Sequence, residues 1–150
     1  MSQLLHQLVL AYQTYFKLIG KSLNNYASSF NGMVDLVVCL SGVNDNLNYI
    51  VKLINEHNWD KIIVITDKSG MGSFKSNKKI DFVVINFKQQ LVSLSKDIKE
   101  KLTGKIKGIE VAVNFVSGEG KEHMALMSAL LKLGIGVRFV ALKPEGIEEI

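Results

Sequence analysis

Two kinds of hydrophobic pattern alternate along the chain. Continuous apolar runs that stop at polar or glycine residues are typical of strands buried on both faces of a sheet. Such runs occupy residues 35–40, 61–66, 81–87, 110–116 and 136–142. Apolar residues at three-and-four spacing predict amphipathic helices between most of the runs. These helical segments are residues 44–56, 89–102 and 119–133.

Buried strands that alternate with helices predict an α/β fold, with a doubly wound, mainly parallel five-stranded sheet. One connection departs from this pattern. Residues 67–79, DKSGMGSFKSNKK, link two strands without a predicted helix and are short for a parallel crossover. A further amphipathic helix is predicted over residues 3–19, followed by a polar stretch. We therefore divide the chain into an N-terminal helix and linker, 1–33, and an α/β domain, 34–150.

Composition narrows the function classes. The chain has 150 residues, 47% hydrophobic, and a net charge of +4 with a single arginine, Arg138. The charge favours anionic partners, but duplex DNA is not expected because base readout depends on bidentate arginine. The lone cysteine, Cys39, cannot form an internal disulfide, which fits the cytoplasm. No apolar run is long enough to span a membrane, the N-terminus does not resemble a signal peptide, and no ligand spacing predicts a metal or cofactor.

Polar and small residues follow the predicted strands, where the ligands of open α/β sheets bind. The residues at these ends are Ser41, Gly42 and Asn44; Thr66, Asp67 and Lys68; Asn86; and Ser117, Gly118, Glu119, Gly120 and Lys121. If the first and fourth strands flank the point where strand order reverses, the two Ser-Gly turns face each other. A ligand crevice would then lie between them.

The turn SGEGK, residues 117–121, suits a phosphate-containing ligand. Gly118 and Gly120 let backbone amides approach a ligand closely, the next helix offers unpaired N–H groups, and Lys121 adds a positive charge. The spacing matches neither a Walker loop nor a dinucleotide fingerprint. A plain glycine-containing turn with a solvated lysine is the alternative. Similarly, the lysines of the 67–79 loop can close over an anion or remain solvated.

The helix after this turn is apolar on nearly all sides, since Ser128 is the only polar residue from Met124 to Leu131. Such a helix must be covered on two faces. The sheet covers one face, and either the helix over residues 3–19 or a second copy of the chain covers the other. We expect a homodimer.

Residues 113–140, VNFVSGEGKEHMALMSALLKLGIGVRFV, resemble the fourth strand, ligand turn and following helix of CARF domains, the CRISPR-associated Rossmann-fold sensors. The first turn, CLSGVNDN, looks like the other half of their site. The resemblance extends over residues 35–142 in element order and is specific only over residues 117–129. It implies a Rossmann-like domain that dimerises and binds a cyclic oligoadenylate across the two-fold axis.

The resemblance also implies roles for individual residues. Lys121 would stabilise charge on a phosphate during cleavage, and Ser41 would position the ring. The implied ligand-binding residues are Gly42, Asn44, Thr66, Ser117, Gly118, Glu119, Gly120 and His123. Glu119 departs from the family pattern and must point outward or accept a ribose hydroxyl. His123 is either a general acid or base, or a solvated or satisfied histidine.

A CARF domain without a second domain resembles a ring nuclease, which would switch off type III CRISPR signalling in antiviral defence. The implied reaction needs no metal: a ribose 2′-OH attacks the neighbouring phosphate, and the protein positions the ring and stabilises charge. The alternative is a sensor or accessory subunit that binds the same messenger without turnover. A third reading is an unrelated nucleotide-binding or interaction module.

Overall fold

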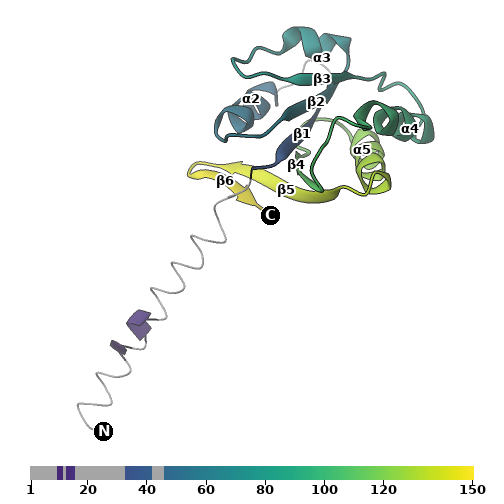
Figure 1. The fold of residues 1–150 in the computed structure, drawn as a ribbon. Helices are drawn as coiled ribbons and strands as arrows, with labels where there is room; N and C mark the ends of the chain where they lie inside the picture. Colours follow the sequence, from purple (N-terminus) through teal and green to yellow (C-terminus); the bar gives the residue numbers. More distant parts are fainter. Residues whose placement is uncertain (1–9, 12, 16–32, 42–45) are drawn as a thin grey trace.

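A computed structural model describes residues 10, 11, 13–15, 33–41 and 46–150 (Figure 1). Ten elements follow Val34 in the described chain. They are β1 (Asp35–Leu40), α2 (Leu47–Asn55), β2 (Ile62–Thr66), α3 (Lys68–Ser73), β3 (Asp81–Val84), α4 (Leu91–Leu102), β4 (Glu110–Asn114), α5 (Gly120–Lys132), β5 (Gly136–Lys143) and β6 (Gly146–Glu149). Residues 10, 11 and 13–15 are helical, and the rest of the helix predicted over 3–19 lies outside the described residues.

The strands form one six-stranded sheet in the order β3-β2-β1-β4-β5-β6. The first five strands are parallel, as the sequence predicts, and β6 runs antiparallel to β5. Strand order reverses between β1 and β4, which confirms the assumption that these two strands flank the switch point. The fold is therefore Rossmann-like.

Two hydrophobic layers cover the sheet (Figure 1). Helices α4 and α5 lie side by side on one face, where Leu94, Ile98 and Leu126 pack onto inward-facing residues of β1, β2 and β4. Helix α2 covers the other face with Ile50 and neighbouring leucine and isoleucine side chains. Because side chains alternate along a strand, each central strand supplies both layers. This explains why the strands are apolar without interruption.

The prediction of five strands was wrong by one. Lys143 pairs with Gly146, so Pro144 and Glu145 form a two-residue turn that returns the chain as β6. Proline as the first of the two central residues and glycine as the last residue are typical of a tight turn. Gly146 has φ 129°. The signal was therefore present in the sequence beyond the fifth strand.

The prediction of a helix-free link between the second and third strands was also wrong. Helix α3 occupies the start of the link and is capped by Asp67, whose Oδ1 accepts the Gly70 N–H at 2.8 Å. Farther along, Lys78 donates to the carbonyls of Ile54 at 2.9 Å and His57 at 2.7 Å, near the end of α2. Lys78 therefore supports a helix terminus in this structure.

Candidate functional site

The two Ser-Gly turns leave the sheet side by side. In the parallel register of β1 and β4, Val38 pairs with Asn114, and Ser41 and Ser117 each lie three residues beyond that pair. Asn46, at the start of α2, donates from Nδ2 to the Val116 carbonyl at 2.8 Å and joins the two turns again. The corner expected from the sequence is thus present. Gly42 and Asn44 lie outside the described residues.

A buried carboxylate, Glu122, connects the two turns. Its side chain is 4% exposed in the first turn of α5. One oxygen, Oε1, accepts the Ser41 hydroxyl at 3.0 Å, and Oε2 accepts the Glu119 backbone N–H at 2.8 Å. A glutamate at this helical position commonly caps the helix N-terminus. Sequence reasoning missed this role, although the spacing of Glu119 and Glu122 is that of a capping box.

Gly118 allows the corner to close tightly. Its φ of 99° is a conformation that L-residues rarely adopt. A Cβ at this position would lie 2.9 Å from Glu122 Oε2, 2.9 Å from His123 Nε2 and 3.1 Å from Cys39 Sγ. Gly120 has no such constraint, because a Cβ there would meet nothing within 4 Å. Only the first of the two glycines is therefore required by the geometry of this corner.

Cys39 and His123 lie beneath the corner. Burial raises the pKa of the Cys39 thiol, and the negative charge of Glu122 raises it further. His123 is half-buried, and its Nε2 lies 2.8 Å from the Ser117 carbonyl. Since a carbonyl only accepts, Nε2 carries a proton. The imidazole also stacks on Phe115, with ring centroids 4.6 Å apart and planes at 10°.

Two predicted ligand residues have buried hydroxyls. Ser117 and Thr66 are fully buried, and neither hydroxyl has a hydrogen-bond partner among the residues the structure describes. Thr66 lies beneath α3, since a Cβ on Gly70 would be 2.1 Å from Thr66 Oγ1. Ser117 lies in the corner itself, immediately before the N-terminus of α5. Because Ser117 is 0% exposed, a ligand could reach its hydroxyl only if the corner opened.

Lys121 points its ammonium at the loop between β3 and α4. Nζ donates to the carbonyls of Phe87 at 2.6 Å and Gln89 at 3.1 Å. These bonds join the start of α5 to the β3–α4 loop. The charge-stabilising role assigned to Lys121 stays a prediction and requires the ammonium to exchange these carbonyls for a phosphate. Glu119 is exposed at the start of α5.

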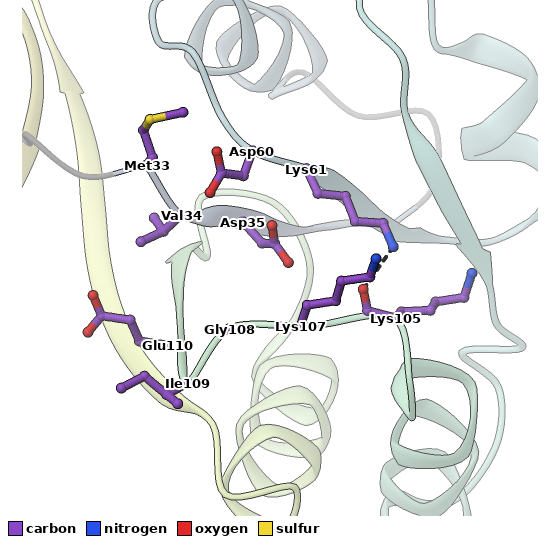
Figure 2. Close-up of a pocket in the computed structure, with 10 residues that line it drawn as sticks. All are labelled: Met33, Val34, Asp35, Asp60, Lys61, Lys105, Lys107, Gly108, Ile109 and Glu110. Atoms are coloured by element: carbon purple, nitrogen blue, oxygen red, sulfur yellow. Dashed lines mark hydrogen bonds between the residues drawn. The ribbon is translucent and has the colours of Figure 1, made fainter.

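Cavities open at both ends of the sheet. One of about 590 Å³ lies at the amino ends of the strands, and Figure 2 shows lysines and acids facing one another across it. Asp81, beside this cavity, accepts hydrogen bonds from Lys105 at 2.9 Å and lies 3.3 Å from the ammonium of Lys61. Two of the lysines that line this cavity, Lys61 and Lys105, are therefore paired with Asp81. Another cavity, of about 740 Å³, lies at the carboxyl ends of β2 and β3.

The described residues contain no group of three His, Cys, Asp or Glu side chains arranged to hold a metal ion. Within the same part of the chain, no helix has both the length and the apolar character needed to cross a membrane.

The described elements define a doubly wound α/β domain whose candidate site lies at the β1–β4 switch point. Neither the known protein families nor the curated proteins include a match to the sequence. Among solved structures, the chain is similar to Enterococcus italicus Csm6 bound to cyclic hexa-2′-fluoro-hexa-dAMP, with a TM-score of 0.50 and 13% sequence identity. The similarity covers 79% of this chain and 35% of the Csm6 chain, so this chain spans about a third of its length. It supports a CARF-like fold.

Proposed function

We propose that this protein binds a cyclic oligoadenylate at the corner formed by Ser41, Ser117 and the N-terminus of α5. The observation that carries the proposal is the meeting of the two turns at the β1–β4 switch point, where Glu122 hydrogen bonds to the Ser41 hydroxyl. The first N–H groups of α5 supply donors for a ligand phosphate or ribose. The Csm6 structure supports the choice of ligand, because its CARF-like fold was solved with such a ring.

Binding rather than turnover is the primary function. Cleavage would proceed by attack of a ribose 2′-oxygen on the adjacent phosphorus. The P–O5′ bond breaks, the 5′-oxygen takes a proton, and a 2′,3′-cyclic phosphate remains. Stabilising the extra negative charge of that transition state needs a cation at the corner. The ammonium of Lys121 donates to two backbone carbonyls, and the buried group that accepts the Ser41 hydroxyl is the carboxylate of Glu122. Both observations favour a messenger-binding protein over a ring nuclease.

We further propose that the site is completed by a second copy of the chain, docked on the outer face of α4 and α5. Val92, Met124 and Leu131 are 81%, 60% and 64% exposed on this face. Val92 and Met124 line a small hollow of about 200 Å³ between the two helices. The same helix, α5, carries its N-terminus into the corner. A partner packed here would therefore bring its own corner to the same edge, facing a two-fold symmetric ring.

Calorimetry with cyclic tetra-adenylate and cyclic hexa-adenylate tests the binding proposal. We expect saturable binding of one ring per two chains, and at least tenfold weaker binding for the linear oligomer. Incubation without metal, followed by chromatography of the nucleotides, tests turnover. We expect the ring to remain intact; cleavage that disappears in Lys121→Ala would make the protein a ring nuclease. Absence of binding to both rings would overturn the proposed function.

The dimer is tested separately by light scattering. Leu131→Glu places a charge on the proposed interface, whereas Ile109→Glu places one at an 85% exposed position at the opposite end of β4. The first variant should be monomeric and lose ring binding, and the second should remain dimeric. Equal masses for the two variants would exclude this face as the interface.

A further inference from the structure

The cavity at the carboxyl ends of β2 and β3 lies at the same edge of the sheet as the corner. Its volume, about 740 Å³, is within the range of small-molecule sites, about 300–1,000 Å³. The lining residues are Asp67, Lys68 and Ser69 on one side and residues 84–88 on the other. We refer to it as the β2–β3 recess.

A hydrogen bond links a residue of the recess to the start of α5. Phe87 lines the recess, and its carbonyl accepts a hydrogen bond from the ammonium of Lys121. Lys121 belongs to the first turn of α5. Two strand spacings separate β3 from β1, which is about 10 Å. A ligand of several linked nucleotides that sits on the corner can therefore place one nucleotide in the recess.

Two hydrogen-bonding groups on the recess lack partners among the described residues. Asp67 Oδ1 accepts both the Ser69 hydroxyl and the Gly70 N–H, each at 2.8 Å, while no bond involves Oδ2. These bonds, the Gly70 N–H foremost, lower the pKa of Asp67, so the carboxylate is an acceptor. Asn86 Oδ1 accepts the Lys88 N–H at 3.0 Å, and no bond involves its Nδ2 donor.

The remaining acceptor and donor match adenine. Thr66 pairs with Val84 in the register of β2 and β3, so the loops that carry Asp67 and Asn86 leave the sheet together. The Watson–Crick edge of adenine offers one donor, the 6-amino group, beside one acceptor, N1. Guanine presents two adjacent donors, which would require both oxygens of the carboxylate. Since Oδ1 of Asp67 already accepts two bonds, the recess favours adenine over guanine.

The recess also has places for the rest of a nucleotide. Val84, Ile85 and Phe87 give it an apolar lining against which the face of a base can pack. Lys68 and Lys88 are exposed on the two sides, and neither ammonium has a partner among the described residues. Two cations beside an apolar recess suit the two phosphates that flank the ribose of a bound nucleotide.

We propose that the β2–β3 recess holds one adenine nucleotide, with the base edge on Asp67 and Asn86 and the phosphates on Lys68 and Lys88. This inference rests on the proposed function for the source of the nucleotide, a unit of the bound ring. It goes beyond that function by assigning base selectivity to residues outside the corner. It also gives the recess a part in setting which ring sizes fit.

Asn86→Asp is the sharpest variant, because it replaces the amide donor by an acceptor and keeps the oxygen that accepts the Lys88 N–H. We expect this change to weaken binding of cyclic hexa-adenylate at least tenfold, since the new carboxylate oxygen, an acceptor, would then face N1, which is also an acceptor. Lys88→Ala should weaken it several-fold. Lys75→Ala is the matched control, because Lys75 is also an exposed lysine but lies in the α3–β3 connection and does not line the recess. This variant should bind like the wild type.

The outcomes separate this inference from the proposed function. If the wild type binds a ring and both Asn86→Asp and Lys88→Ala bind it equally well, the recess assignment is overturned and the corner remains. If the wild type binds no ring, titration with AMP decides the assignment. Saturable AMP binding that Asn86→Asp abolishes supports the recess alone, and failure to bind AMP overturns it together with the proposed function.

Discussion

Replacing Gly118 with alanine probes the corner without any ligand. The residue has φ 99°, and an alanine forced into this conformation costs about 1–2 kcal/mol. The new Cβ would also lie 2.9 Å from Glu122 Oε2, 2.9 Å from His123 Nε2 and 3.1 Å from Cys39 Sγ. Glu122 and Cys39 are buried and have little space to move, so this crowding adds about 1–3 kcal/mol. We expect the free energy of unfolding to fall by about 2–5 kcal/mol.

Gly120→Ala is the matched control, two residues away at the start of α5. A Cβ at Gly120 meets nothing within 4 Å, and alanine favours the helix, so this variant should equal or exceed the wild type in stability. Urea unfolding followed by circular dichroism measures both. With a slope of about 1–3 kcal/mol per molar urea, the midpoints should differ by at least about 0.7 M. Midpoints within about 0.3 M of each other would refute the described geometry of the corner.

Three further predictions concern charges and the thiol. Glu122→Gln removes a buried negative charge beside the proposed phosphate position and should tighten ring binding by about tenfold in calorimetry; unchanged or weaker binding would indicate that the carboxylate contacts a ligand donor instead. Although burial acts to raise the pKa of Asp81, hydrogen bonds from Lys105 and Lys61 hold it below its ordinary value of 3.8, so its stabilising contribution is present above about pH 4 and is lost as the pH falls further. Asp81→Asn should therefore lower stability at pH 7 by about 1 kcal/mol and shrink the loss between about pH 4 and pH 2, and an unchanged acid profile would contradict this. The raised pKa and burial of Cys39 predict that a thiol reagent at about pH 8 labels it only as fast as the domain opens, so rapid labelling of the native protein would contradict its position beneath the corner.

The sheet could be predicted from the sequence because its strands are apolar without interruption. Residues 35–40 were predicted as a strand with the same bounds as β1, and the parallel arrangement followed from the intervening helices. Helix α3 was missed because two glycines and two serines from Lys68 to Phe74 hide a helix of low propensity. Its signals are Asp67 as N-cap and Gly70, where a larger residue would collide with Thr66.

The candidate site was predicted at the level of segments and not of contacts. The alternation of strands and helices placed Ser41 and Ser117 at one edge, and the register of β1 and β4 agrees. Residue spacing could not predict that Glu122 joins the two turns, because Glu122 and Ser41 are 81 residues apart in the sequence. The orientation of Lys121 was equally inaccessible, since its partners are backbone carbonyls of a distant loop.

Titration of the wild-type protein with cyclic hexa-adenylate, compared with Ser41→Ala, measures whether the corner binds the ring. Ser41 contributes a hydroxyl at the corner and its removal leaves the sheet intact, so a change in affinity reports on the site itself. We expect saturable binding by the wild type and at least fivefold weaker binding by the variant. Failure of the wild type to bind the ring, or equal affinity of the two proteins, would contradict this expectation.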